Sequence, residues 1–144
     1  TLGGRPSRFV GSYVIPVTIT LYPTDGGLSI VRNVLTDPTG HLGVTNITPG
    51  TYDMLVKGFN TLAKRVTNAE VRNDAPIINF GYLAAGDANG DNCVNGFDFS
   101  ILARCFGKHD GIYGYDPRAD FNGDKQINIL DFSMLAANYN RCGD

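Results

Sequence analysis

The sequence predicts two small domains: an antiparallel β-sandwich over residues 1–83 and an all-α domain over residues 87–144. Two observations carry this prediction. Short stretches of alternating apolar and polar residues, separated by glycine and proline, fill the first domain. A polar loop followed by a helical pattern then occurs twice, over residues 87–108 and 120–141. Residues 84–86 make a very short linker, so we expect the domains to be docked on each other.

The composition is that of a globular protein without a basic surface. Hydrophobic residues make up 42% of the 144 residues and charged residues 18%, which excludes a disordered chain. The formal net charge is −2 and lysine and arginine form no run, so we expect no nucleic-acid partner. No apolar stretch is long enough to span a membrane, and no signal peptide is visible. Because the chain begins at Thr1 without methionine, we expect a fragment of a longer polypeptide, so the missing signal says little about export.

The strands of the first domain follow one another at short intervals. Residues 1–8 are expected to be irregular, because they contain glycine and proline. Val17, Ile19 and Leu21 alternate with threonine and tyrosine, which predicts a half-buried strand. We expect further strands over residues 29–35, 42–47, 52–57, 63–71 and 76–82. About 75 residues make a small core, so this domain is expected to gain stability from its neighbour.

Two stretches of this domain resemble a known family. Residues 36–42 (Thr-Asp-Pro-Thr-Gly-His-Leu) and residues 47–57, with Pro-Gly-Thr-Tyr at 49–52, are similar to the carboxypeptidase-regulatory-like β-sandwich. The resemblance implies a transthyretin-like or immunoglobulin-like fold with a structural and not a catalytic role. His41 lies in the turn of this motif, where we expect it to be solvated.

The second domain opens with a loop of oxygen-bearing residues that recurs later in the chain. The first copy reads Asp-Ala-Asn-Gly-Asp-Asn-Cys-Val-Asn-Gly-Phe-Asp from residue 87, and the second reads Asp-Phe-Asn-Gly-Asp-Lys-Gln-Ile-Asn-Ile-Leu-Asp from residue 120. Side-chain oxygens at positions 1, 3, 5, 9 and 12, with a backbone carbonyl at position 7, are the ligand spacing of a twelve-residue calcium loop. A plain surface loop rich in aspartate and asparagine is the alternative, but two copies that run into the same Asp-Phe-Ser-x-Leu-Ala string favour calcium.

A helical pattern follows each loop. Four residues at helical spacing share a predicted face in each copy. They are Phe99, Leu102, Ala103 and Phe106 in the first copy and Phe132, Leu135, Ala136 and Tyr139 in the second. Gly107 is placed to end the first helix, and Asn140 takes its place in the second copy. Since no helix precedes the first loop, the unit is EF-hand-like only from the loop onward.

Paired loop–helix repeats with the spacing Asp-x-Asn-x-Asp-x-x-x-Asn-x-x-Asp resemble a dockerin of the type I pattern, over residues 86–142. The resemblance implies two bound Ca²⁺ ions and docking onto a cohesin domain of a scaffold protein, as in cellulosome-like assemblies that degrade plant polysaccharides. It also implies that the β-sandwich is an X-type module that braces the dockerin. Carried over by position, the ligands are Asp87, Asn89, Asp91, the Cys93 carbonyl, Asn95 and Asp98, then Asp120, Asn122, Asp124, the Gln126 carbonyl, Asn128 and Asp131. Asp98 and Asp131 are the implied bidentate ligands, and the position-9 asparagines are expected to act through water.

Two features inside the loops bear on this assignment. Position 6, where glycine is preferred, holds Asn92 in the first loop and Lys125 in the second. Asparagine tolerates a left-handed backbone better than lysine does, so on this count the second site is expected to be the weaker one. Val94 and Ile127 follow the carbonyl ligands and are expected to point into the core.

The resemblance also implies which residues read the partner, at positions 10, 11, 17, 18 and 22 of each repeat. These are Gly96, Phe97, Ala103, Arg104 and Lys108 in the first copy and Ile129, Leu130, Ala136, Ala137 and Arg141 in the second. Type I dockerins often carry serine or threonine at positions 10 and 11, so the apolar residues here leave the type of partner open. Phe97, Ile129 and Leu130 fit either a core or an exposed interface. Because Gly-Phe and Ile-Leu make the two copies unequal, we expect one preferred docking orientation.

The three cysteines do not have zinc-binding spacing. The antiparallel helices that the resemblance implies bring Cys142 beside the first loop, so we predict a Cys93–Cys142 disulfide with Cys105 buried. Such a bond indicates an oxidising location and hence a secreted, extracellular protein. Three free thiols are the alternative, because sequence alone does not fix cysteine pairing.

The leading functional hypothesis is a non-catalytic assembly module that is a monomer without its partner. The alternative is a carbohydrate-binding β-sandwich with a calcium-stabilised spacer. The aromatic residues available to hold sugar would be Tyr13, Tyr22, Tyr52 and Phe59, of which Tyr52 also fits the core.

We do not expect an enzyme. His41 and His109 are isolated in the sequence, and Glu70 is the single glutamate, so no catalytic set is visible. A calcium sensor is also disfavoured, because sensors open a methionine-rich groove and this chain has two methionines.

Overall fold

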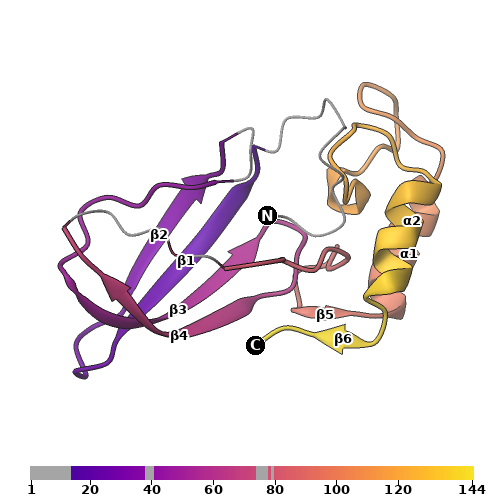
Figure 1. Cartoon of the computed structure of the whole chain (residues 1–144). Helices are drawn as coiled ribbons and strands as arrows, with labels where there is room; N and C mark the ends of the chain where they lie inside the picture. The colour runs from indigo at the N-terminus through magenta and orange to yellow at the C-terminus, as the bar shows by residue number, and fades with distance from the viewer. Residues whose placement is uncertain (1–13, 38–40, 74–77, 79) are drawn as a thin grey trace.

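The computed structural model describes residues 14–37, 41–73, 78 and 80–144. Four strands form one antiparallel sheet in the spatial order β2-β1-β3-β4. They are β1 (Pro16–Pro23), β2 (Ile30–Leu35), β3 (Gly50–Gly58) and β4 (Lys64–Val71). The later elements are β5 (Cys93–Val94), α1 (Gly96–Cys105), the 3-10 helix η1 (Pro117–Ala119), α2 (Ile129–Ala137) and β6 (Arg141–Cys142). The sheet lies at one end of the molecule and the two helices lie side by side at the other (Figure 1).

The predicted β-sandwich is wrong: the first part of the described chain contains a single four-stranded sheet. Residues 42–47 form no strand, and neither do residues 78 and 80–82, the described part of the predicted strand at 76–82. Asn46 has a φ of 58°, which an extended strand does not accommodate. Leu42, Val44, Ile47, Ile78 and Phe80 nevertheless pack against the buried face of the sheet. Their alternation therefore reflects burial of an irregular covering layer and not strand pairing.

The inner face of the sheet forms the first core. Val17, Ile19 and Leu21 of β1 are all buried, which confirms their predicted inward orientation. Tyr52 of β3 is also buried, and its hydroxyl donates to the Thr48 carbonyl oxygen at 2.7 Å. The predicted irregular segment at residues 1–8 lies outside the described residues.

The C-terminal part is not all-α, which corrects the second half of the predicted fold class. Its two helices are accompanied by a two-stranded antiparallel sheet, in which Cys93 lies opposite Cys142 and Val94 lies opposite Arg141. An isolated bridge joins His109 to Gln126 at the corresponding place of the second repeat. Backbone N–H and carbonyl groups in the loops need hydrogen-bond partners, and short β-pairing supplies them. This need is why the C-terminal part contains strands as well as helices.

The two repeats exchange this β-pairing with each other. The segment that follows α2 pairs with the first loop, since Asn140 N donates to Val94 O at 2.8 Å. The segment that follows α1 pairs with the second loop in the same way, since Gly107 N donates to Ile127 O at 2.8 Å. The repeats are thus related by a local pseudo-two-fold arrangement in which each one completes the other.

The helices are rotated by about one residue from the predicted faces. The buried residues of α1 are Asp98, Leu102 and Cys105, whereas Phe99, Ala103 and Phe106 are exposed. The buried residues of α2 begin likewise with Asp131, and Phe132 is exposed. Because the aspartate at position 12 must point into its loop, it fixes the rotation of the helix and leaves the following phenylalanine outside.

A second core lies between the helices and the loops. Val94 and Ile127 are fully buried in it, as predicted. Leu62, from the turn between β3 and β4, belongs to the same core and so ties the sheet to the repeats. Leu62 N donates to Ala84 O at 2.7 Å, and Gly86 N donates to Asn60 O at 3.1 Å, so the short linker is docked as expected. Among the described helices, none is long and apolar enough to cross a membrane.

Candidate functional site

The two loops, residues 87–98 (loop 1) and 120–131 (loop 2), hold their first aspartate in the same way. Asp87 Oδ1 accepts a hydrogen bond from Gly90 N at 2.7 Å, and its Oδ2 accepts one from Asn92 N at 3.0 Å. Asp120 accepts the corresponding bonds from Gly123 N and Lys125 N, also at 2.7 and 3.0 Å. The chain therefore wraps around the position-1 carboxylate in both loops.

The aspartate at position 12 closes each loop onto the helix that follows. Asp98 accepts from Asn89 N at 3.1 Å and from Asn95 N at 2.8 Å. Asn95 is the N-cap of α1 and accepts from Phe97 N, so positions 9 and 12 form a capping box. Asn128 and Asp131 repeat this box at the start of α2. The helix start and the loop are consequently one structural unit.

The middle of each loop is also matched. Asp91 accepts from the Asn89 amide at 2.8 Å and from Cys93 N at 2.9 Å, and Asp124 makes the corresponding contacts in loop 2. Position 6 has a left-handed backbone in both loops, with φ of 69° at Asn92 and 67° at Lys125. The two loops thus share the same hydrogen bonds at position 5 and the same backbone conformation at position 6.

The electrostatics of the loops favour a bound cation. Asp87, Asp98 and Asp131 are fully buried and Asp120 nearly so. Burial raises the pKa of Asp131 to about 6, although backbone N–H donors oppose this shift. In contrast, the hydrogen bond from Asn89 lowers the pKa of the exposed Asp91. Buried carboxylates are costly without a counter-charge, and of these four only Asp87 has an ion pair within the described chain.

The donor set fits calcium by its chemistry. Within the described ranges, no three His, Cys, Asp or Glu side chains gather as a metal cluster. Apart from the aspartates, the predicted ligands of each loop are asparagine side-chain oxygens and one backbone carbonyl, which suit a hard cation such as Ca²⁺ and not a soft one. A loop of this kind combines two or three carboxylates with neutral oxygens, and both loops contain that combination.

The position-1 carboxylates of the two loops differ in the side chain that contacts them from outside the loop. Lys57 Nζ, from β3, donates to Asp87 Oδ2 at 2.5 Å and to Thr61 O at 2.8 Å. Asp120 Oδ2 instead accepts from the Tyr115 hydroxyl at 2.9 Å. The sequence analysis missed both residues. No local pattern signals a lysine that lies 30 positions before the loop, whereas the tyrosine-rich connector before loop 2 was a visible but unspecific signal.

The predicted partner residues lie at or near the surface of the two repeats. Phe97 is 73% exposed, Ile129 61% and Leu130 41%, so these three side chains are not core residues. Lys108 is half-buried, and the other predicted partner positions are exposed. Those are Gly96, Ala103, Arg104, Ala136, Ala137 and Arg141.

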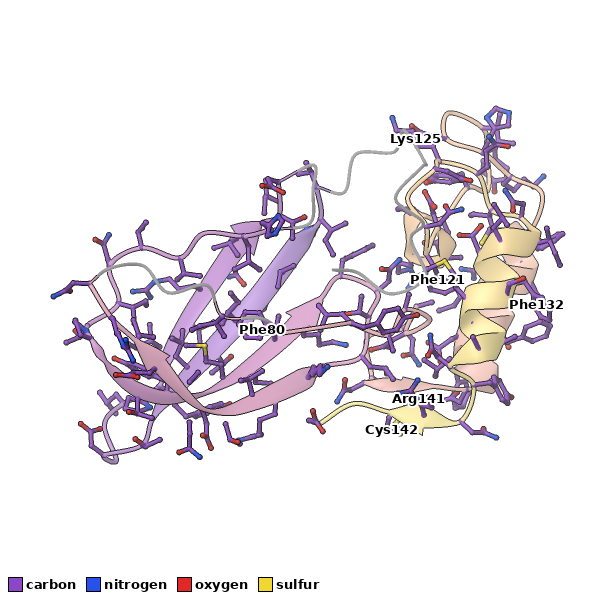
Figure 2. All side chains as sticks on the ribbon, in the orientation of Figure 1. Phe80, Phe121, Lys125, Phe132, Arg141 and Cys142 are labelled. Atoms are coloured by element: carbon purple, nitrogen blue, oxygen red, sulfur yellow. A yellow bond between two sulfur atoms is a disulfide. The ribbon has the colours of Figure 1, made fainter. Side chains whose placement is uncertain are left out.

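Two phenylalanines that the helical pattern placed on one face with Leu102 and Leu135 are also exposed here. The rings of Phe99 and Phe132 lie 6.2 Å apart between centroids, edge to face at 67°, and connect α1 to α2. Figure 2 shows Phe132 on the side of the helices that faces away from the sheet. We call the exposed apolar side chains at the start of the helices the helix surface: Phe97, Phe99, Ile129, Leu130 and Phe132.

The aromatic residues considered for carbohydrate binding do not form one platform. Tyr52 is buried in the sheet core, and Tyr13 lies outside the described residues. Tyr22 is near the end of β1, whereas Phe59 N donates to Pro16 O at the beginning of that strand. Six residues of strand separate these positions, a distance of about 20 Å.

The cysteines occupy two environments. Cys93 and Cys142, the pair expected from the sequence, are joined by a disulfide that lies across β5 and β6. Cys105 is free and buried, and it donates to Ile101 O at 3.0 Å. Burial raises the pKa of the Cys105 thiol.

The isolated titratable residues show no shared site. His109 is exposed, with its Nδ1 at 2.8 Å from Asp110 O. His41 is exposed beside Asp37, and Glu70 pairs with Arg72 at the surface of β4. These residues lie in different parts of the fold.

Comparison with known proteins agrees with this geometry. Residues 85–140 match the model of the dockerin type I domain family. No protein with a curated functional description matches the chain. Among solved structures, a chain from a type II cohesin–X–dockerin complex of Acetivibrio cellulolyticus, an N-terminal interface mutant, aligns at 23% identity with a TM-score of 0.63. The alignment covers 88% of this chain and 83% of that one.

A second structure, a C-terminal interface mutant of the same kind of complex from the same organism, aligns at 21% identity with a TM-score of 0.67. It covers 96% of this chain and 93% of the other, and so includes both the sheet and the repeats. Residues 85–140 thus carry the dockerin type I pattern, and nearly the whole chain shares the fold of a chain from cohesin–X–dockerin complexes.

Proposed function

We propose that this chain is a non-catalytic assembly module that docks the polypeptide carrying it onto a cohesin domain of a scaffold protein. The observation that carries the proposal is the exposed helix surface, which lies on the part of the chain that matches the dockerin model. The similarity to chains of cohesin–X–dockerin complexes supports the same partner. Cellulosome-like complexes that degrade polysaccharide are the setting in which such docking is used.

The helix surface has the composition of an interface centre. Aromatic side chains dominate the binding energy of many protein interfaces, and three of its five residues are phenylalanines. Phe99 and Phe132 are in contact with each other while both are exposed, and exposed apolar patches mark interaction sites. Phe97 at the start of α1 has no equal at the start of α2, where Ile129 and Leu130 lie, so one docking orientation is preferred.

We further propose that the two loops bind two Ca²⁺ ions. The ligands are those assigned by position, from Asp87 to Asp98 in loop 1 and from Asp120 to Asp131 in loop 2. Support comes from the four buried aspartates, whose charge a divalent ion would balance. The disulfide between Cys93 and Cys142 supports an extracellular location for the module.

The sheet acts as a brace for the repeats in this proposal, as an X-type module. The turn between β3 and β4 contacts both loops. Asn60 Nδ2 donates to Asp120 O at 3.1 Å, and Ala63 N donates to the Asn92 side-chain oxygen at 2.7 Å. Leu62 is buried between them in the core of the repeats. The sheet therefore contacts both loops, whereas Phe132 of the helix surface faces away from the sheet (Figure 2).

Calorimetric titration against a panel of type I and type II cohesins, in saturating Ca²⁺ and in chelator, tests the function. We expect tight binding to at least one cohesin in Ca²⁺ and none in chelator. Phe97→Asp and Leu130→Asp are expected to weaken binding unequally and so to show which repeat is used. Tyr113→Asp is the control, because Tyr113 is fully exposed and belongs to the connector, outside both helices. If folded, calcium-loaded protein binds no cohesin, the docking function is wrong and a polysaccharide array becomes the next measurement.

A further inference from the structure

The two position-1 aspartates provide a matched comparison within one molecule. Each carboxylate accepts two hydrogen bonds from backbone N–H groups, at 2.7 and 3.0 Å in both loops, and a third from a side chain outside the loop. The outside donor is the Lys57 ammonium for Asp87 and the Tyr115 hydroxyl for Asp120. The loops therefore agree in the number of donors and differ in the charge of one of them.

The Lys57 ammonium is held firmly in place. Its second hydrogen bond, to the carbonyl oxygen of Thr61 at 2.8 Å, anchors it to the turn that follows β3. The Asp87 side chain is fully buried, and the Lys57 side chain is only 30% exposed. Such a contact is screened less by solvent than a surface ion pair.

From this comparison, which rests on the proposed calcium-binding function, we propose that Lys57 makes loop 1 the weaker calcium site and leaves loop 2 as the primary one. The Lys57 ammonium already neutralises part of the negative charge of loop 1, so a Ca²⁺ ion gains less electrostatic stabilisation there. It also repels a divalent ion that shares the same carboxylate. In loop 2 the Tyr115 hydroxyl is uncharged, so it neither neutralises the carboxylate nor repels the ion.

The size of the effect follows from the distances. A Ca²⁺ ion lies about 2.3–2.6 Å from its carboxylate oxygens. With the ammonium 2.5 Å from Asp87 Oδ2, the two cations would be about 5 Å apart. Even with the full screening of water, a single and a double charge at this separation reduce the affinity about tenfold. The weaker screening at a partly buried site makes tenfold a lower bound.

This ranking is opposite to the order inferred from position 6. Asn92 and Lys125 both adopt the left-handed backbone, with nearly equal φ angles. A non-glycine residue with a left-handed backbone is thus strained in each loop, and this strain is only partly smaller for Asn92 than for Lys125. A full charge beside the metal outweighs that difference, because it acts on the ion directly.

Calcium titration of single-loop variants tests the proposal. Asp124→Ala disables loop 2 and Asp91→Ala disables loop 1, and both residues lie outside the buried set of aspartates. We expect the remaining loop 1 to bind Ca²⁺ at least tenfold more weakly than the remaining loop 2, by calorimetry or by terbium luminescence. Adding Lys57→Met is expected to strengthen calcium binding by loop 1 at least tenfold and to leave the affinity of loop 2 within twofold.

Two further variants control for other effects of the change. Lys57→Arg keeps the charge and is expected to keep the affinity of loop 1. Lys64→Met removes a lysine from the same sheet, where it begins β4, and is expected to change neither loop. The comparison between the two single-loop proteins needs no change at Lys57, so it decides the ranking even if Lys57→Met fails to fold.

The possible outcomes separate this inference from the function on which it rests. Equal affinities of the two loops, or a loop 1 that weakens when Lys57 is removed, would overturn the proposal while calcium binding stands. If neither single-loop protein nor the parent chain binds calcium, the calcium proposal itself fails and this inference fails with it.

Discussion

Removal of the disulfide gives the sharpest test of how the ends of the repeats are held together. Cys93 and Cys142 are 49 positions apart in the sequence, so the bond closes a loop of about fifty residues in the unfolded chain. The chain-entropy relation values such a closure at about 4 kcal/mol of unfolding free energy. We therefore expect Cys93→Ser with Cys142→Ser to lose about 4 kcal/mol.

The folded state gives no reason for a larger loss. β5 and β6 remain paired without the bond, because Asn140 N donates to Val94 O at 2.8 Å and Gly143 N donates to Asn92 O at 2.9 Å. Neither sulfur belongs to the buried core of the repeats. The effect is thus expected to arise in the unfolded chain, with the native circular dichroism spectrum unchanged.

The assay is equilibrium urea denaturation in saturating Ca²⁺, followed by circular dichroism. Each single serine variant serves as a control, since either one breaks the same bond and should lose as much as the pair. A double variant that loses less than about 1 kcal/mol would refute the entropic argument, as would two single variants that each lose half. Non-reduced protein without the mass of a disulfide would remove its premise.

Three further outcomes follow from individual residues. Leu62→Ala is expected to cost about 2–4 kcal/mol in urea denaturation, because this side chain from the turn between β3 and β4 is buried in the core of the repeats; an unchanged urea midpoint would contradict this expectation. Arg118 lowers the pKa of the partly buried Asp116, so Asp116→Asn is expected to lose about 1 kcal/mol above pH 4. That loss should fade as the pH falls through the lowered pKa, and a loss that stays constant with falling pH would count against it. Burial raises the pKa of Cys105, so iodoacetamide at pH 8.5 is expected to label this thiol only after unfolding, as read by mass spectrometry; rapid labelling of the native chain would argue against burial.

The loops were predictable from the sequence because their chemistry is local. Positions 1 to 12 lie within one short stretch, and the spacing of oxygens there is set by the geometry of a single turn around a point. Asp98 and Asp131 were assigned in this way, and the structure places both at the junction of loop and helix. The exposure of Phe99 and Phe132 follows from those two aspartates, but a hydrophobicity pattern alone assigns the phenylalanines to the core.

The features that the sequence did not reveal depend on distant contacts. The alternation at residues 42–47 predicted a strand, yet it records burial against the sheet without pairing. Lys57 has an ordinary outward position in β3, and only the folded chain brings its ammonium to Asp87. The pairing between each loop and the segment after the other helix is likewise invisible in the pattern of either repeat.

That exchange of β-pairing has a consequence for how such a module divides. Neither repeat is a self-sufficient folding unit, because the partner for its loop is encoded behind the helix of the other copy. A peptide with one repeat would lack the backbone partner of its loop, and we expect it to pair with a second copy of itself about a two-fold axis. The present chain is in this sense a symmetric dimer whose two subunits have been joined into one polypeptide. The connector joins the end of the first repeat to the start of the second, and the disulfide joins the first loop to the segment after α2, so the two repeats are covalently linked at both places.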